Sequence, residues 1–69
     1  MQIQLNHKQE KVMRTALEFG KYVTTTKIAA EARVSWNTAD KYLHEFAKNR
    51  WINRLAQGNR DYWKAVPAK

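Results

Sequence analysis

The spacing of hydrophobic and polar positions changes along the chain, and each change marks a boundary between predicted elements. Apolar residues recur every three or four positions over residues 7–19, which predicts a helix. Asn6 can cap the start of this helix, and Gln9 completes a capping box with it. Gly20 can adopt the left-handed conformation that ends a helix. The chain therefore begins with one well-delimited amphipathic helix.

A short extended piece and a second helix are predicted next. Residues 22–24 are aromatic and β-branched, which favours a very short strand or an extended link. A helix over 26–33 follows, with Thr25 or Thr26 as its cap. Ala29 lies on its apolar face, where a small side chain allows another helix to cross closely.

A third helix is predicted over residues 36–49, with Ser35 as its cap. At 100° per residue its apolar side contains Ala39, Leu43, Phe46 and Ala47. The opposite side is a polar stripe made of Asn37, Lys41, His44 and Lys48. No apolar residue interrupts this stripe, so we expect it to face away from the core.

Past Arg50 the pattern predicts a β-hairpin over residues 51–66. Gly58 and Asn59 stand in the order that a two-residue type II′ turn prefers, so that residue 57 faces residue 60. Both faces of this hairpin would carry large side chains. One face has Ile52 and Trp63, and the other has Trp51, Leu55, Tyr62 and Val66. The pattern leaves open which face packs on the helices.

Composition narrows the class of protein. The chain has 69 residues, which fits a single domain over 1–69, and it has no Cys for disulfides or thiolate metal sites. No apolar stretch approaches the roughly 20 residues of a membrane span, so we expect a soluble, cytoplasmic protein, nucleoid-associated or in a host-cell cytoplasm. Thirteen Lys and Arg against six Asp and Glu give a net charge of +7, which favours a polyanionic partner.

Catalytic and metal motifs are not recognisable in the sequence. No nucleophile has a base at a motif spacing, and no glycine-rich phosphate loop is present. His7 is the only other histidine that could join His44 at a metal. The sequence therefore predicts a binding protein and not an enzyme, with no cofactor and no metal.

The segment "TTKIAAEARVSWNTADKYLHEF" and the hairpin "WINRLAQGNRDYWKAV" together resemble a winged helix-turn-helix DNA-binding domain of the small prokaryotic transcription-regulator type. The resemblance extends over residues 6–66. It implies an α+β, mainly α fold, with a three-helix helix-turn-helix core followed by a C-terminal two-stranded β-hairpin wing. One departure is Arg33, because many such turns have Gly before the apolar plug, here Val34; a positive φ would cost Arg roughly 1 kcal/mol.

The resemblance also implies how double-stranded DNA would be bound, with the third helix in the major groove and the wing on flanking backbone or minor groove. Asn37 can pair with adenine, Lys41 can reach guanine or phosphate, and Thr38 can contact a thymine methyl or a phosphate. The candidate DNA-binding residues are Thr26, Lys27, Ser35, Trp36, Asn37, Thr38, Lys41, His44, Lys48, Arg54, Asn59 and Arg60. A sequence-specific transcriptional regulator is the expected function.

Several alternatives stay open. Trp36 either donates its indole N–H to a phosphate or folds back beside the second helix as core. Arg54 either reaches DNA or stacks on Trp63 across the hairpin. The same fold could be a protein-interaction module or an architectural factor that assists recombination. Specific binding usually needs two copies, and the surface for a homodimer would be the first helix or the arm containing Ile3 and Leu5.

Overall fold

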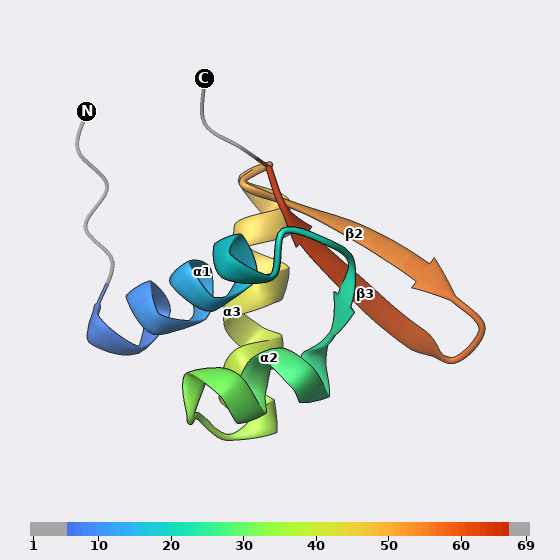
Figure 1. Ribbon diagram of the computed structural model, residues 1–69. Helices are drawn as coiled ribbons and strands as arrows, with labels where there is room; N and C mark the ends of the chain where they lie inside the picture. Colours follow the sequence, from blue (N-terminus) through green and yellow to red (C-terminus); the bar gives the residue numbers. More distant parts are fainter. Residues whose placement is uncertain (1–5, 67–69) are drawn as a thin grey trace.

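The computed structural model of the protein describes residues 6–66, and Figure 1 shows a hairpin projecting beside the helices. The arm containing Ile3 and Leu5 lies outside these residues. The elements occur in the order α1 (His7–Phe19), β1 (Val23–Thr24), α2 (Thr25–Ala32), α3 (Trp36–Lys48), β2 (Ile52–Gln57) and β3 (Arg60–Ala65). The predicted fold class, a three-helix core followed by a β-hairpin, is confirmed.

The ends of α1 are those that the sequence predicts. The Asn6 side chain accepts a hydrogen bond from the backbone N–H of Gln9 at 2.8 Å, and the Gln9 side chain accepts one from the Asn6 N–H at 2.9 Å. Gly20 ends the helix with a left-handed φ of 62°. The capping box and the glycine together fix both ends of this helix.

The cap of α2 differs from the prediction. Thr24, and not Thr25 or Thr26, is the N-cap, and its hydroxyl accepts from the Lys27 N–H at 3.3 Å. Thr24 is in extended conformation because it is also the last residue of β1, so the helix starts one residue earlier than expected. Thr25 is already the first residue of the helix, and its buried hydroxyl accepts a hydrogen bond from the indole of Trp63.

The turn between α2 and α3 accommodates a strained residue. Arg33 takes a φ of 60° at the C-cap of α2, in the left-handed region that usually favours glycine. The Val34 N–H then donates to the Ala29 carbonyl at 3.1 Å, which closes the turn. Ser35 caps α3 as predicted by accepting from the Thr38 N–H, and the helix ends at Lys48, one residue before the expected end.

The hairpin has the predicted register, with Gln57 opposite Arg60. Gly58 adopts a φ of 61°, as the first central position of a type II′ turn requires. The short strand expected near residues 22–24 is β1, which pairs with β3 and makes a three-stranded antiparallel sheet of order β1-β3-β2. The wing is therefore joined at its base to the strand that leads into α2.

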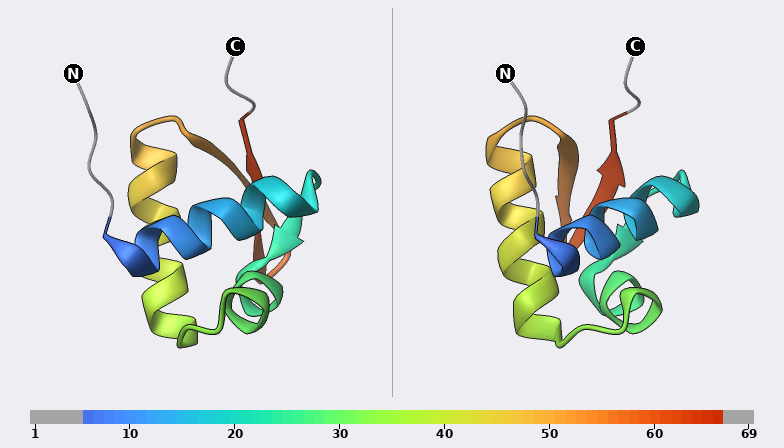
Figure 2. Two further views of the ribbon diagram at one scale, coloured as in Figure 1. Left: turned by 60° about the vertical axis from the view of Figure 1, so that its left-hand side comes forward. Right: turned by 90° about the vertical axis from the view of Figure 1, so that its left-hand side faces the viewer.

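One face of the hairpin packs on the helices, which settles the point that the sequence left open. Ile52, Trp63 and Ala65 are buried, whereas Leu55 and Val66 on the other face are 39% and 40% exposed. In the left view of Figure 2, α1 crosses in front of α3, and the hairpin beside α3 passes behind α1. The core joins residues from all these elements: Val12, Ala16, Val23, Ile28, Ala32, Leu43, Phe46, Ile52, Trp63 and Ala65.

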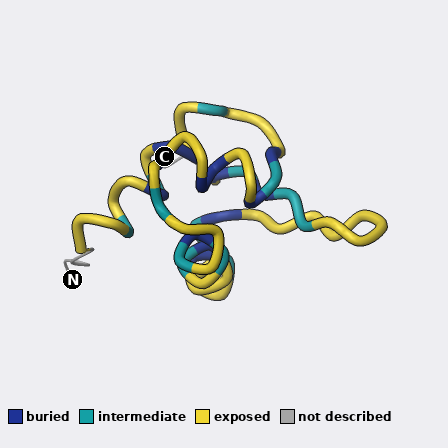
Figure 3. The backbone as a smooth tube through the Cα atoms, turned by 90° about the horizontal axis from the view of Figure 1, so that it is seen from below, coloured by how far each residue is buried: buried dark blue, intermediate teal, exposed yellow. Residues whose placement is uncertain are grey.

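The outer part of the hairpin extends away from this core, and Figure 3 shows it as a loop of exposed positions at the edge of the molecule. Every residue from 53 to 60 is exposed. Among the described residues, no helix is both long enough and apolar enough to cross a membrane.

Candidate nucleic-acid interface

The outward stripe of α3 is uncovered. Asn37, Lys41, His44 and Lys48 are all exposed, while Ala39, Leu43 and Phe46 on the opposite side are at most 1% exposed. The predicted division of this helix into a polar and an apolar face is therefore present in the fold. Because the stripe projects from a regular helix, its side chains have the spacing needed to contact base edges in a major groove.

The first turn of α3 has an ordered polar arrangement. Ser35 donates its hydroxyl hydrogen to the Thr38 hydroxyl at 2.8 Å and accepts from the Thr38 N–H at 3.2 Å. Thr38 is half-buried, whereas Ser35 and Asn37 are exposed. Trp36 is 50% exposed, so the alternative of a core position for this indole is wrong.

An open groove lies between the start of α2, the start of α3 and the tip of the hairpin, with a volume of about 760 Å³. Five of the candidate DNA-binding residues line it: Thr26, Lys27, Trp36, Asn59 and Arg60. Trp36 thus stands beside α2, as one alternative expected, but as a wall of this groove. The groove brings together helix and hairpin residues that are far apart in sequence.

The two arginines of the hairpin have different surroundings. Arg60 is exposed at the tip and lines the groove beside Asn59. Arg54 donates from Nε and Nη2 to the Asp61 carboxylate at 3.1 and 2.9 Å, and its guanidinium carbon lies 6.0 Å from the Trp63 ring centroid. The alternative in which Arg54 stacks on Trp63 is therefore present, which makes Arg60 the less constrained cation.

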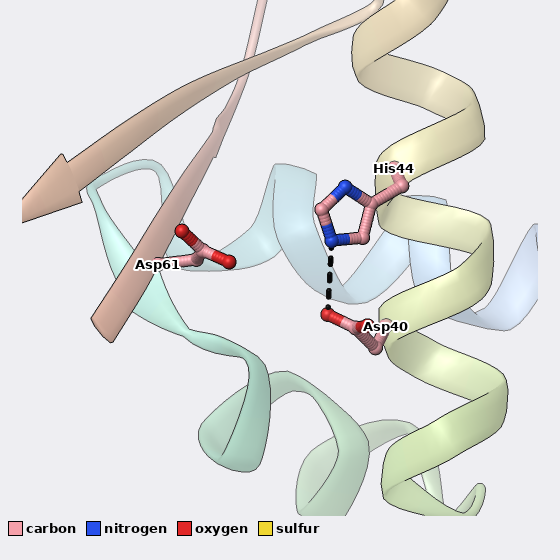
Figure 4. Close-up of side chains that lie close together, drawn as sticks. All are labelled: Asp40, His44 and Asp61. Carbon is pink, nitrogen blue, oxygen red and sulfur yellow. Dashed lines mark ion pairs between the residues drawn. The ribbon is translucent and has the colours of Figure 1, made fainter. Parts of the chain in front are cut away.

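His44 meets a pair of carboxylates where α3 faces the hairpin (Figure 4). Its Nε2 lies 3.3 Å from Oδ1 of Asp40, one turn earlier on the same helix. Asp61 on β3 places a carboxylate oxygen within 4.8 Å of both groups. The imidazole also contacts the Trp63 indole edge-on, with 5.0 Å between ring centroids. His44 is therefore held on several sides although it belongs to the exposed stripe.

Charge is distributed unevenly over the elements. Asp61 forms an ion pair with Arg54, and Asp40 lies beside His44, which makes an ion pair only when the imidazole is protonated; the described residues 6–66 contain no other such pair. The cations of the α3 stripe and the groove have no ion-pair partner within the described residues: Lys27, Lys41, Lys48 and Arg60. This surface is therefore mainly cationic, which suits an anionic ligand.

Three contacts at or beneath this surface were missed from the sequence. Asp40 and His44 are four residues apart, so their proximity was available from helix geometry. The approach of Asp61 was not, because it depends on the angle at which the hairpin packs. The hydrogen bond from Trp63 Nε1 to the Thr25 hydroxyl, 2.7 Å long and buried, likewise depends on tertiary packing alone.

Comparison with known proteins identifies structures of the same fold but no sequence relatives. No protein-family model matches the chain, and no curated protein matches it either. The antimony-specific transcriptional repressor AntR superposes with a TM-score of 0.81 at 18% identity, over 90% of this chain and 55% of that one. The zinc-responsive MarR family member ZitR of Lactococcus lactis superposes at 0.71 and 19% identity, over 96% and 46%.

A third structure of this fold was determined in complex with DNA. Wild-type ZitR of Lactococcus lactis in complex with DNA matches at a TM-score of 0.70 and 19% identity, over 96% of this chain and 46% of that chain. Identities this low show the fold alone, which is the winged helix-turn-helix fold. The chain spans about half the length of these repressors.

Proposed function

We propose that this chain binds double-stranded DNA as the DNA-binding domain of a transcriptional regulator, with α3 in the major groove and the hairpin on the flanking backbone or minor groove. The observation that carries the proposal is the uncovered polar and cationic face of α3, which has Asn37 and Lys41 near its start. The ZitR structure in complex with DNA supports it, because that protein has the same fold and binds DNA.

The chemistry of each part decides which residues can contact bases and which can contact phosphates. Asn37 and Lys41 on α3 can hydrogen-bond to base edges, which differ between base pairs in the major groove. Lys27, Trp36 and Arg60 line the groove beside α3, where they can contact phosphates without reading sequence. Base contacts and backbone contacts thus come from adjacent but separate parts of one surface.

A salt titration on duplex DNA tests the proposal. Because Lys and Arg release counterions from phosphates, the affinity should fall steeply as salt is raised. Lys41→Ala should weaken binding by about 1 to 3 kcal/mol and reduce the preference for the best sequence. Arg60→Ala should weaken binding to all duplexes alike.

Lys11→Ala is the matched control, since it removes the same charge from an exposed position on α1. If binding depends on the α3 surface, Lys11→Ala should retain much more affinity than Lys41→Ala. Equal losses in the two variants, or affinity that does not change with salt, would contradict the proposal. An architectural factor would instead show DNA bending and cooperative coverage in footprints.

Two copies of the chain are part of this proposal, because specific sites are usually read by two half-site contacts. Leu17 on α1 is 52% exposed and Tyr22 just beyond it is 41% exposed, which makes α1 the best-supported surface for a second copy. The same apolar exposure is what favours the second candidate function, a protein-interaction module. Sedimentation of wild type and Leu17→Glu, with and without DNA, distinguishes DNA binding by two copies from a protein-interaction module.

A further inference from the structure

We propose that Asp40, His44 and Asp61 form a binding site for one divalent metal ion of the zinc type, which joins α3 to the hairpin. The metal site itself does not depend on the proposed function. Its consequence for DNA binding does rest on that function.

The donor atoms have the chemistry and spacing of such a site. One imidazole nitrogen and two carboxylates are ligands that Zn²⁺ accepts, at about 2.0 to 2.2 Å each. Two tetrahedral ligands at these lengths are about 3.3 Å apart, and Nε2 of His44 lies 3.3 Å from Oδ1 of Asp40. One Asp61 carboxylate oxygen lies within 4.8 Å of a ligand atom of each of the other two residues, so a shift of that side chain would bring it to the same ion.

Neighbouring residues orient two of these side chains. The edge-on contact with the buried Trp63 orients the His44 ring, leaving Nε2 directed toward Asp40. Arg54 holds Asp61 through a single carboxylate oxygen, Oδ1, which both guanidinium hydrogen bonds share. The second oxygen of Asp61 makes no hydrogen bond within residues 6–66, so it is available to a metal. Partners of this kind outside the ligands commonly orient metal sites.

Coordination requires a lone pair on Nε2 of His44, so the ring hydrogen must reside on Nδ1 when the metal is bound. Three protein ligands leave one position of a tetrahedral ion open. Water or another oxygen donor can occupy that position.

The position of the cluster gives it a consequence for DNA binding. Asp40 and Asp61 place two carboxylates where the proposed α3 and hairpin contacts meet, so they oppose an approaching phosphate strand. A bound divalent cation would cancel this negative charge and offer its open position to a phosphate oxygen. We therefore expect the ion to strengthen DNA binding and to fix the angle between α3 and the hairpin.

Calorimetric titration of the full chain with Zn²⁺, in the absence of DNA, tests the site directly. We expect one ion per chain, and no comparable binding of Mg²⁺, because imidazole favours zinc-like ions over magnesium. Asp40→Asn, His44→Gln and Asp61→Asn should each weaken binding at least about tenfold, since loss of even an outer partner commonly costs about 10- to 100-fold.

His7→Gln is the matched control, because His7 and His44 are the only histidines of the chain. It should leave the Zn²⁺ affinity unchanged. Thermal unfolding by circular dichroism should show Zn²⁺ raising the melting temperature of wild type and His7→Gln but not of His44→Gln. This readout also establishes that His44→Gln is folded.

Absence of stoichiometric binding, or binding that survives His44→Gln but is lost in His7→Gln, would overturn the inference. Loss in His44→Gln with full retention in both Asp variants would also overturn it. DNA binding without any Zn²⁺ binding would leave the proposed function intact and refute only this site. Zn²⁺ binding in a chain that fails to bind DNA would support this site and refute the proposed function.

Discussion

The root and the tip of the hairpin belong to the same two strands, yet the root is buried and the tip is exposed. At the root, which we define as Ile52, Trp63 and Ala65, every side chain is buried against the helices. At the tip, residues 55–60, every side chain is exposed. The root also has a buried hydrogen bond to Thr25, whereas the tip is held only by its own ladder and turn.

The root positions the hairpin against the helices, whereas the tip provides residues that line the groove. The Trp63 side chain contacts Thr25 of α2, His44 of α3 and Arg54 of β2, so this one residue links the hairpin to two helices. The tip supplies Asn59 and Arg60 to the groove. Substitutions at the root should therefore change stability, and substitutions at the tip should change binding.

Trp63→Ala should have the largest effect on stability. Removing a large, fully buried aromatic side chain typically costs about 3 to 5 kcal/mol, because the surrounding side chains refill the cavity only in part. Leu55→Ala, on the exposed face, is the comparison and should cost far less. Urea unfolding followed by circular dichroism measures both. Similar losses in the two variants would mean that the root does not anchor the hairpin.

Thr25→Val should destabilise the protein by about 1 to 3 kcal/mol. Valine keeps the shape but removes the acceptor of the 2.7 Å bond, which leaves the Trp63 indole N–H buried without a partner. Thr26→Val is the matched control, because Thr26 is the next residue and is exposed. Thr25→Ser, which keeps the hydroxyl, should recover part of the lost stability. A Thr25→Val variant as stable as Thr26→Val would show that the bond contributes nothing.

These two regions also differ in how far the sequence predicts them. The register of the hairpin followed from Gly58 and Asn59, since a two-residue turn fixes every pair in the ladder. The face that packs inward did not follow, because large side chains occur on both faces. Local pattern specifies pairing along the strands, whereas burial depends on helices elsewhere in the chain.

The candidate interface could likewise be predicted from the sequence only where local pattern decides the structure. The exposure of Asn37 and Lys41 followed from helix periodicity, because Ala39, Leu43 and Phe46 had to be buried. The groove and the approach of Asp61 to His44 required the tertiary angle between hairpin and helix. The predicted cap of α2 was wrong because Thr24, whose extended backbone suits an N-cap, belongs to a strand that pairs with β3, a distant part of the chain.

Gly58→Ala probes the turn itself and should cost about 1 kcal/mol. An added Cβ would meet no atom within 4 Å, so the cost arises from the φ of 61° alone. Unfolding measurements should show this small loss, and the exposed Asn59→Ala provides a control at a position without the glycine requirement. A loss as large as that of Trp63→Ala would mean that the tip contributes to the core.

Arg60→Ala should have the smallest effect on stability, within about 0.5 kcal/mol, because the side chain is exposed and makes no ion pair with the described residues. Its effect should instead be on DNA affinity, which we expect to fall for every duplex with a reduced salt slope. Arg54→Ala is the contrasting variant, because that arginine is bound to Asp61 and lies over Trp63. It should lose more stability and less of the salt-dependent affinity than Arg60→Ala. If the two arginines behaved alike in both measurements, the separation between an anchoring root and a contacting tip would be wrong, since Arg54 lies over Trp63 of the root whereas Arg60 belongs to the tip.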